Sequence, residues 1–219
     1  MRRIALFLAA ALLGVQPALA QVCAGSPSFA GAPLHLDFAM LFNTNAQSYH
    51  AGMDWGGKTA FASGVVGWTT YNSVFGGDAW DFGAGFGLQA KPSHNVHLCP
   101  AVFAGYSDGP KDIAGSGVNF SEMNFSAGLQ SAVVALHRKT IEIIPNAAFI
   151  VANARSKVSR PAAPDSTDWD SFALLTLGLA IGFNNEVTLG PSVTFPFGLA
   201  GGATTYGVSF AIGLRKHRN

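Results

Sequence analysis

All thirteen Lys and Arg residues of this chain lie outside the segments in which apolar and polar residues alternate. A strand that faces water normally accepts such a residue, whereas an outward cation near the midplane of a membrane-spanning β-barrel costs roughly 2–4 kcal/mol. The cations are found at Arg2, Arg3, Lys58, Lys91, Lys111, Arg138, Lys139, Arg155, Lys157, Arg160, Arg215, Lys216 and Arg218. This distribution indicates strands that face lipid.

The first twenty residues have the parts of a secretory signal peptide. Two arginines at 2–3 precede an apolar run over 4–15, and residues 18–20 form the small-x-small pattern of a cleavage site. The apolar run is shorter than the ~20 residues that a helix needs to span a bilayer. We therefore expect residues 1–20 to be removed and the mature chain to begin at Gln21.

Apolar residues alternate with small or polar residues along most of the remaining chain, which is the period of a strand with two different faces. In the last segment one phase holds Tyr206, Val208, Phe210, Ile212 and Leu214, and the other holds Thr205, Gly207, Ser209, Ala211 and Gly213. After the signal peptide, no apolar run approaches the length of a spanning helix. If the chain crosses a membrane, it must therefore do so with strands.

Ten segments carry this alternation, and the connections between them differ in length. The segments cover residues 34–43, 48–56, 59–71, 79–90, 95–107, 119–136, 140–154, 170–183, 186–197 and 204–214. Tight connections lie at 57–58, 91–94, 137–139 and 184–185, and longer ones at 72–78, 108–118 and 155–169. Tight turns on one side and long loops on the other are typical of a transmembrane β-barrel.

We therefore predict an all-β chain that forms a closed, antiparallel, up-and-down transmembrane β-barrel. It should have ten strands, with eight as the alternative. The predicted organisation is a signal peptide at 1–20, an N-terminal periplasmic segment at 21–33, the barrel at 34–214 and a basic tail at 215–219.

This pattern resembles the small outer-membrane β-barrel proteins of Gram-negative bacteria, over roughly residues 30–214. Aromatic residues near the predicted strand ends fit the resemblance, namely Tyr49, Trp68, Trp80, Tyr106 and Tyr206 at one end and Trp55 and Phe183 at the other. The family usually ends its last strand with an aromatic residue, whereas this strand ends at Leu214. The resemblance implies an outer-membrane location with both termini in the periplasm, and contact with outer-membrane lipids and the barrel assembly machinery.

A water-soluble barrel of the lipocalin type, with its apolar phase inward, is the alternative fold. Its polar phase would then face water, yet that phase consists of Gly, Ser, Ala and acidic residues without Lys or Arg. Soluble surfaces normally mix both signs of charge. The pattern therefore favours the membrane barrel.

If the apolar phase faces lipid, the opposite phase lines the interior and holds acids and histidines without any Lys or Arg. These candidates are His35, Asp37, His50, Asp54, Asp81, His97, Glu122 and Glu142. Buried carboxylates without cations keep counter-ions nearby or take up protons, because an unpaired buried charge is costly. Our hypothesis is therefore an interior that attracts small cations, and its His and carboxylate groups could bind a divalent metal or shuttle protons. No metal ligand and no cofactor is predicted. The alternative is a hydrogen-bonded filling of a narrow barrel.

Both cysteines are expected at the periplasmic end of the barrel. Cys23 follows the cleavage site, and Cys99 lies early in an upward strand with its side chain inward. Because the periplasm is oxidising, we predict a disulfide between them that stabilises the fold by about 2–4 kcal/mol. The alternatives are two free buried thiols and a zinc site with His35 and His97, for which no ligand spacing gives support.

The sequence contains no G-x-S-x-G elbow, phosphate loop or H-E-x-x-H motif, so no catalytic residue is predicted. A formal net charge of +1 gives no basis for nucleic-acid binding. Three functions remain. The first is an envelope-structural or surface-interaction role carried by the loops at 108–118 and 155–169. The second is a narrow cation-preferring channel or carrier, and the third is a lipid-modifying enzyme.

Overall fold

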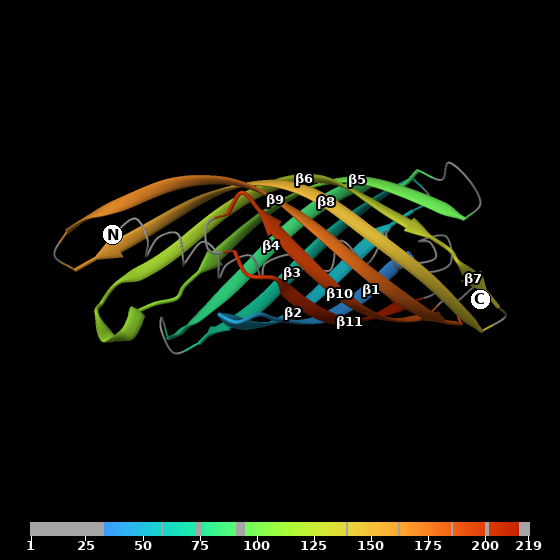
Figure 1. Cartoon of the computed structure of the whole chain (residues 1–219), viewed down its shortest axis with the longest axis horizontal. Helices are drawn as coiled ribbons and strands as arrows, with labels where there is room; N and C mark the ends of the chain where they lie inside the picture. Colours follow the sequence, from blue (N-terminus) through green and yellow to red (C-terminus); the bar gives the residue numbers. More distant parts are fainter. Residues whose placement is uncertain are drawn as a thin grey trace.

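A computed structural model of the protein describes residues 33–57, 59–72, 76–90, 95–138, 140–161, 163–184, 186–199 and 202–214. They form a closed antiparallel sheet of ten long strands (Figure 1). The long strands are β1 (Leu34–Phe42), β2 (Ala46–Gly56), β3 (Ala60–Tyr71), β4 (Asp78–Leu88), β5 (Val96–Asp108), β6 (Asn119–Val133), β8 (Ile141–Arg160), β9 (Ala163–Phe183), β10 (Val187–Phe197) and β11 (Thr205–Leu214). A two-residue strand β7 (Leu136–His137) and a 3-10 turn η2 (Ile113–Gly115) complete the elements.

Each long strand pairs with its neighbours along the chain, and the first strand pairs with the last. The register of β1 and β11 runs from Leu34 opposite Leu214 to Phe42 opposite Tyr206, which closes the barrel. β6 pairs directly with β8, while β7 only extends the turn between them. The predicted closed barrel of ten strands is therefore confirmed, and the alternative of eight strands is wrong.

The alternation in the sequence separates the outside of the barrel wall from its inside. The apolar phase is exposed, with side chains such as Phe38, Val102 and Phe149 more than half accessible. Aromatic side chains meet on this outer surface, since the rings of Trp68 and Trp80 lie edge to face at 4.8 Å. A closed wall with an apolar outer surface and a polar inner one suits a bilayer. Lipid offers no hydrogen-bond partner to the backbone, and in a closed barrel every strand is paired on both sides, so no backbone N–H or C=O group faces lipid unpaired.

The two ends of the barrel differ. One end carries the β2–β3 and β9–β10 turns, the start of β1 at Leu34 and the end of β11 at Leu214. We call it the turn end. The opposite end carries the connection from Gly109 to Val118 and the β8–β9 hairpin; we call it the loop end. In Figure 1 the hairpin reaches out on the left and β7 lies on the right. No described helix is long and apolar enough to cross a bilayer.

The predicted loop at 155–169 is wrong, because β8 and β9 continue through it as a paired hairpin. The outward phase of this stretch is mostly polar, with Arg155, Lys157, Asp165 and Thr167, so the apolar alternation that marks a lipid-facing strand is missing. The same hairpin places Arg155, Lys157 and Arg160 inside a strand. The outward phase of β8 is apolar only as far as Val151, so these cations lie beyond the apolar band.

Several predictions concern residues that the structure does not describe. The signal peptide at 1–20, most of the segment at 21–33, Cys23 and the tail at 215–219 lie outside the described residues. They remain predictions, as does the periplasmic position of both termini.

Candidate functional site

The eight polar side chains that the sequence places in the barrel interior are all buried. Each is at most 6% exposed, and the set comprises His35, Asp37, His50, Asp54, Asp81, His97, Glu122 and Glu142. No Lys or Arg side chain is buried in the described part of the chain. The described interior is therefore acidic. Burial alone does not make these residues a functional site.

Six interior positions form a row that crosses six neighbouring strands. Consecutive members are paired in the strand register: His50 in β2, Gly67 in β3, Asp81 in β4, Ser107 in β5, Glu122 in β6 and Ser156 in β8. We call this set the acidic row. Neighbouring strands are about 4.8 Å apart. The two carboxylates on either side of Ser107 are therefore close enough to interact electrostatically.

Hydroxyl groups hold both carboxylates of the acidic row. Thr69 donates a hydrogen bond of 2.6 Å to Asp81 Oδ2 and shares another, of 2.9 Å, with the hydroxyl of Ser48. Ser156 donates a hydrogen bond of 3.2 Å to Glu122 Oε2. A buried carboxylate without donors loses the solvation it had in water, so these bonds offset part of the cost of burying it.

The side chain of His50 lies over Gly67. A β-carbon on Gly67 would stand 2.6 Å from His50 Nδ1 and 3.3 Å from Asp81 Cβ, so glycine leaves the room in which the two side chains approach. Neither ring nitrogen of His50 has a hydrogen-bond partner among the described residues, and the same holds for the hydroxyl of Tyr71. Together with the carboxylates, these atoms can bind water or a small cation.

A second acidic group lies nearer to the turn end, between β1 and β2. In the strand register His35 stands opposite Asp54, and Asp37 stands opposite Gly52. The carboxyl groups of Asp37 and Asp54 lie close enough to interact electrostatically, and so do His35 and Asp37. The structure thus brings three of the eight predicted residues together here.

His97 and Glu142 have other neighbours. The Nδ1 atom of His97 lies 3.4 Å from Nε2 of Gln89, and the carboxylate of Glu142 contacts Nδ1 of His137 in β7. Among the described residues, no three His, Cys, Asp or Glu side chains are arranged to hold a metal ion. The predicted residues therefore divide into the acidic row, the β1–β2 group and these two separate contacts.

Apolar side chains close the loop end beside the acidic row. The buried cluster consists of Ala46, Tyr71, Ala79, Phe120 and Val158, with Ile113 and Val118 packed against it. The connection between β5 and β6 supplies those last two residues and is braced internally, because Asp112 Oδ1 accepts a 2.7 Å hydrogen bond from Gly117 N. The predicted outer loop at 108–118 is thus partly a cap that packs onto the barrel mouth.

Phenylalanine rings fill the interior closer to the turn end. Phe61 and Phe103 are buried together, and their rings lie against the inward faces of Gly87 and Gly83. The absence of a side chain at Gly83 and Gly87 leaves space inside the barrel, and the two rings occupy it. These glycines therefore make room for aromatic packing.

Cys99 belongs to the same buried cluster and is disulfide-bonded. Cys23 is the other cysteine of the sequence and lies outside the described residues. Oxidation of Cys99 fits the oxidising compartment that a secretory signal implies.

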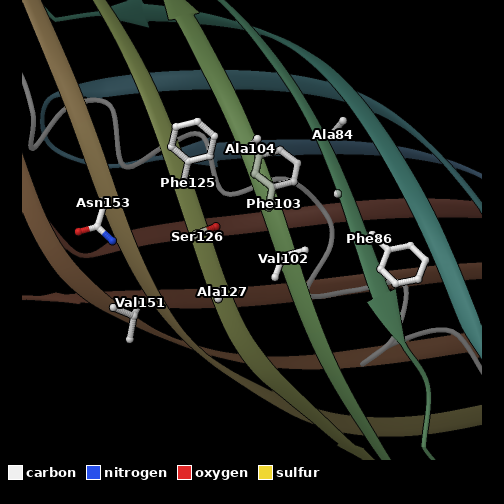
Figure 2. A pocket seen from close by; sticks show the side chains of 11 residues that line it. Ala84, Phe86, Val102, Phe103, Ala104, Phe125, Ser126, Ala127, Val151 and Asn153 are labelled. Carbon is white, nitrogen blue, oxygen red and sulfur yellow. The ribbon is translucent and has the colours of Figure 1, made fainter.

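A groove of about 620 Å³ lies in the outer wall across β4, β5, β6 and β8. Figure 2 shows the small side chains of Ala84, Ala104 and Ala127 with the larger rings of Phe86 and Phe125 around them. Its lining is almost entirely apolar, and most of it belongs to the lipid-facing phase, while Gly85, Phe103 and Ser126 belong to the inward phase. A lipid acyl chain would fit it as part of ordinary contact with the bilayer, so the groove does not define a separate site.

Sequence reasoning missed the residues that shape the acidic row and fill the barrel. Gly67, Thr69 and Phe61 all lie in β3, whose segment at 59–71 shows no clear apolar phase in the sequence. In the structure the odd-numbered side chains of β3 face inward, and Phe61, Thr69 and Tyr71 are buried. Pairing with β2 and β4 determines which side chains of β3 face inward. The clear alternation of those two neighbouring strands is the sequence signal from which the phase of β3 could have been inferred.

No family model matches the chain, and no curated protein matches it. Among solved structures, the translocator domain of the autotransporter NalP from Neisseria meningitidis is similar with a TM-score of 0.51 and 10% identity, over 98% of this chain and 94% of that one. Neisserial surface protein A gives a TM-score of 0.43 at 10% identity, over 84% of this chain and 99% of that one. The β-barrel domain of Pseudomonas aeruginosa OprF gives 0.40 at 9% identity, over 84% and 99%. Similarity at this level of identity concerns the fold alone.

Proposed function

We propose that this closed ten-stranded β-barrel lies in the outer membrane and acts there without catalysis, as a surface-interaction protein whose β8–β9 hairpin makes the contact. One observation carries the proposal. The two strands continue well past the apolar band, as far as Arg160 and Ala163 at the tip (Figure 1). Binding surfaces are commonly placed on segments that a rigid scaffold holds out into solvent.

The composition of the hairpin supports contact with a partner in water. Its exposed side chains include Asp165 and Asp168, which suit solvent, together with Trp169, which is 64% exposed. Large aromatic side chains are enriched at protein interfaces, because one ring contributes a large contact area.

The contacts of the interior argue against catalysis. Nucleophilic catalysis needs a hydroxyl that gives its proton to a base such as histidine. Thr69 instead donates to the carboxylate of Asp81, and His50 accepts no hydrogen bond from any described hydroxyl. The His50–Asp81 pair thus lacks the hydroxyl-to-histidine hydrogen bond that would activate a nucleophile.

A narrow cation-preferring passage is the second candidate function. The acidic row favours it, since two carboxylates face the interior and no described Lys or Arg is buried. The apolar cluster at the loop end and the rings of Phe61 and Phe103 oppose it, because they fill the path. Planar-bilayer recording of the refolded mature chain separates the two candidates: a silent, folded barrel favours the first.

Shortening the hairpin tests the first candidate directly. Asn153 and Ser171 are paired in the register, so an Asn-Gly turn can join them in place of residues 154–170, which removes Asp168, Trp169 and Asp170. The intact and shortened barrels are placed in lipid nanodiscs and screened against phage-displayed peptides, with heat-modifiable gel mobility as the folding control. We expect the intact barrel to enrich peptides that the shortened one does not bind. Equal enrichment, or none, would overturn the proposal.

A further inference from the structure

The projecting part of β9 has a partner strand on one side only. β10 pairs with β9 from Phe183 back to Ala173 and goes no further. β8 continues to pair with β9 as far as Ala163. Gly198, just after β10, still lies near Ser171 and Phe172. Among the described residues, the edge of β9 is therefore open over 163–170.

An open strand edge presents a row of backbone N–H and C=O groups to solvent. Another chain can use that row as a template and add itself as a further strand. Eight residues at about 3.4 Å each give an edge of about 27 Å, of which residues 165–170 accommodate an extended peptide of about six residues. Pro164 has no N–H to donate, so the usable part of the edge begins at Asp165.

The side chains along this edge are arranged by face. Asp168 and Asp170 share the face that continues the barrel interior, while Trp169 points to the opposite face. Asp170 lies near enough to Glu122 for their charges to interact, which adds a third carboxylate to that side. One face of the edge is thus acidic, and the other presents an aromatic ring.

Among the residues that the structure describes, Asp168 and Asp170 have no cationic partner. Lys157 Nζ lies 2.7 Å from Asp165 Oδ2, and this hydrogen bond, helped by Ser159, holds the pKa of Asp165 below its usual range. Within the described residues, neither Asp168 nor Asp170 forms an ion pair. The acidic face therefore carries uncompensated negative charge beside an unpaired backbone.

We propose that the open edge of β9 binds an extended peptide strand with alternating basic and apolar residues. The inference rests on the proposed surface-interaction function and names the partner. Basic side chains would lie opposite Asp168 and Asp170, and an apolar side chain between them would pack on Trp169, because directly opposite residues of paired strands share a face. The backbone supplies the hydrogen bonds and the side chains supply the selectivity.

A second copy of this chain fits the edge less well. Two such edges would bring Asp168 and Asp170 of one chain against the same acidic residues of the other, and like charges opposite each other are destabilising. Charges and Pro164 also resemble the features by which proteins protect edges from aggregation. Protection needs no exposed tryptophan, however, so Trp169 favours a partner.

The test uses the folded mature barrel in lipid nanodiscs and fluorescent peptides of sequence Lys-Val-Lys-Val-Lys-Val. Fluorescence anisotropy gives the affinity, and hydrogen exchange reports protection of the amides of 165–170. We expect at least tenfold weaker binding by two control peptides: one with the same residues in blocks, and one N-methylated at alternate amides. Replacing lysine by glutamate should abolish binding.

Variants of the barrel identify the contacts. The double change Asp168→Asn and Asp170→Asn should weaken binding several-fold and reduce its dependence on salt, and Trp169→Ala should also weaken it. Asp78→Asn is the matched control, because Asp78 is an exposed carboxylate at the same end of the barrel. The affinity of the Asp78→Asn variant for the peptide should equal that of the unchanged protein.

Two results would overturn the inference while leaving the proposed function intact. One is equal binding of the N-methylated and unmodified peptides, which excludes strand addition. The other is enrichment of peptides that depend on the hairpin but lack basic and apolar alternation. If shortening the hairpin changes no binding at all, the proposed function itself fails.

Discussion

The imidazole of His50 reaches over Gly67 towards the carboxylate of Asp81, although their strands β2 and β4 do not pair with each other. The intervening strand β3 contributes no side chain at this position. Two groups on strands about 9.6 Å apart can therefore approach across the inner wall. The lack of a β-carbon on one residue thus determines the geometry of the acidic row.

Replacing Gly67 with alanine should destabilise the barrel by about 1–3 kcal/mol, which is the usual cost of forcing an extra methyl group into a packed interior. The new β-carbon would stand 2.6 Å from His50 Nδ1, so the imidazole must move away from Asp81. Urea unfolding in lipid vesicles, followed by tryptophan fluorescence, measures the loss.

Gly64→Ala is the control for this substitution. It lies in the same strand, and a β-carbon there would meet no atom within 4 Å. We expect its unfolding free energy to stay within about 0.5 kcal/mol of the original, as surface changes usually do. Equal effects of the two alanines would contradict the packing described for His50.

The interior position of the acidic residues could be predicted from the sequence, but their alignment could not. A period of two assigns His50, Asp81 and Glu122 to one side of the wall whatever the register. Whether they stand level with one another depends on the lengths of the turns and the stagger of each strand pair. Those quantities are set by closure of the whole barrel, which no local pattern contains.

The hairpin and the aromatic filling were missed for a different reason. The outward phase of residues 155–169 is mostly polar, and a strand outside the bilayer does not need the apolar alternation that lipid imposes. Phe61 lies in a segment without a clear phase, so its inward direction follows only from pairing with β4, where it stands opposite Gly87. The packing of a large side chain against a glycine on the neighbouring strand depends on the register between strands, which the local sequence does not determine.

Val102→Arg should destabilise the barrel by about 2–4 kcal/mol in a bilayer, because Val102 is 54% exposed in the middle of the apolar band. Asn153→Arg should cost about 0–1 kcal/mol, since Asn153 lies where the outward phase of β8 turns polar. Unfolding free energies in vesicles compare the two variants. Similar costs for both arginines would show that Val102 does not face hydrocarbon.

Removing the disulfide of Cys99 should lower the free energy of unfolding by about 2–4 kcal/mol, because the open chain regains conformational freedom when unfolded. The variant carries Cys99→Ser and Cys23→Ser together, so that no free thiol remains. Urea unfolding with and without reductant measures the difference. Reductant should destabilise the original protein and leave the double variant unchanged; an equal response of both would show that the bond contributes nothing.

Opening the interior should create conductance where the original barrel has little. Phe61→Ala with Phe103→Ala removes the rings that lie against Gly87 and Gly83, and each change should also cost about 3–5 kcal/mol of stability. If the acidic row lines the opened path, the new current should prefer cations, and adding Asp81→Asn and Glu122→Gln should reduce that preference. Planar-bilayer recording measures both quantities, with gel mobility as the folding control. Equal conductance of the original and the opened barrel would show that the two rings do not block the path.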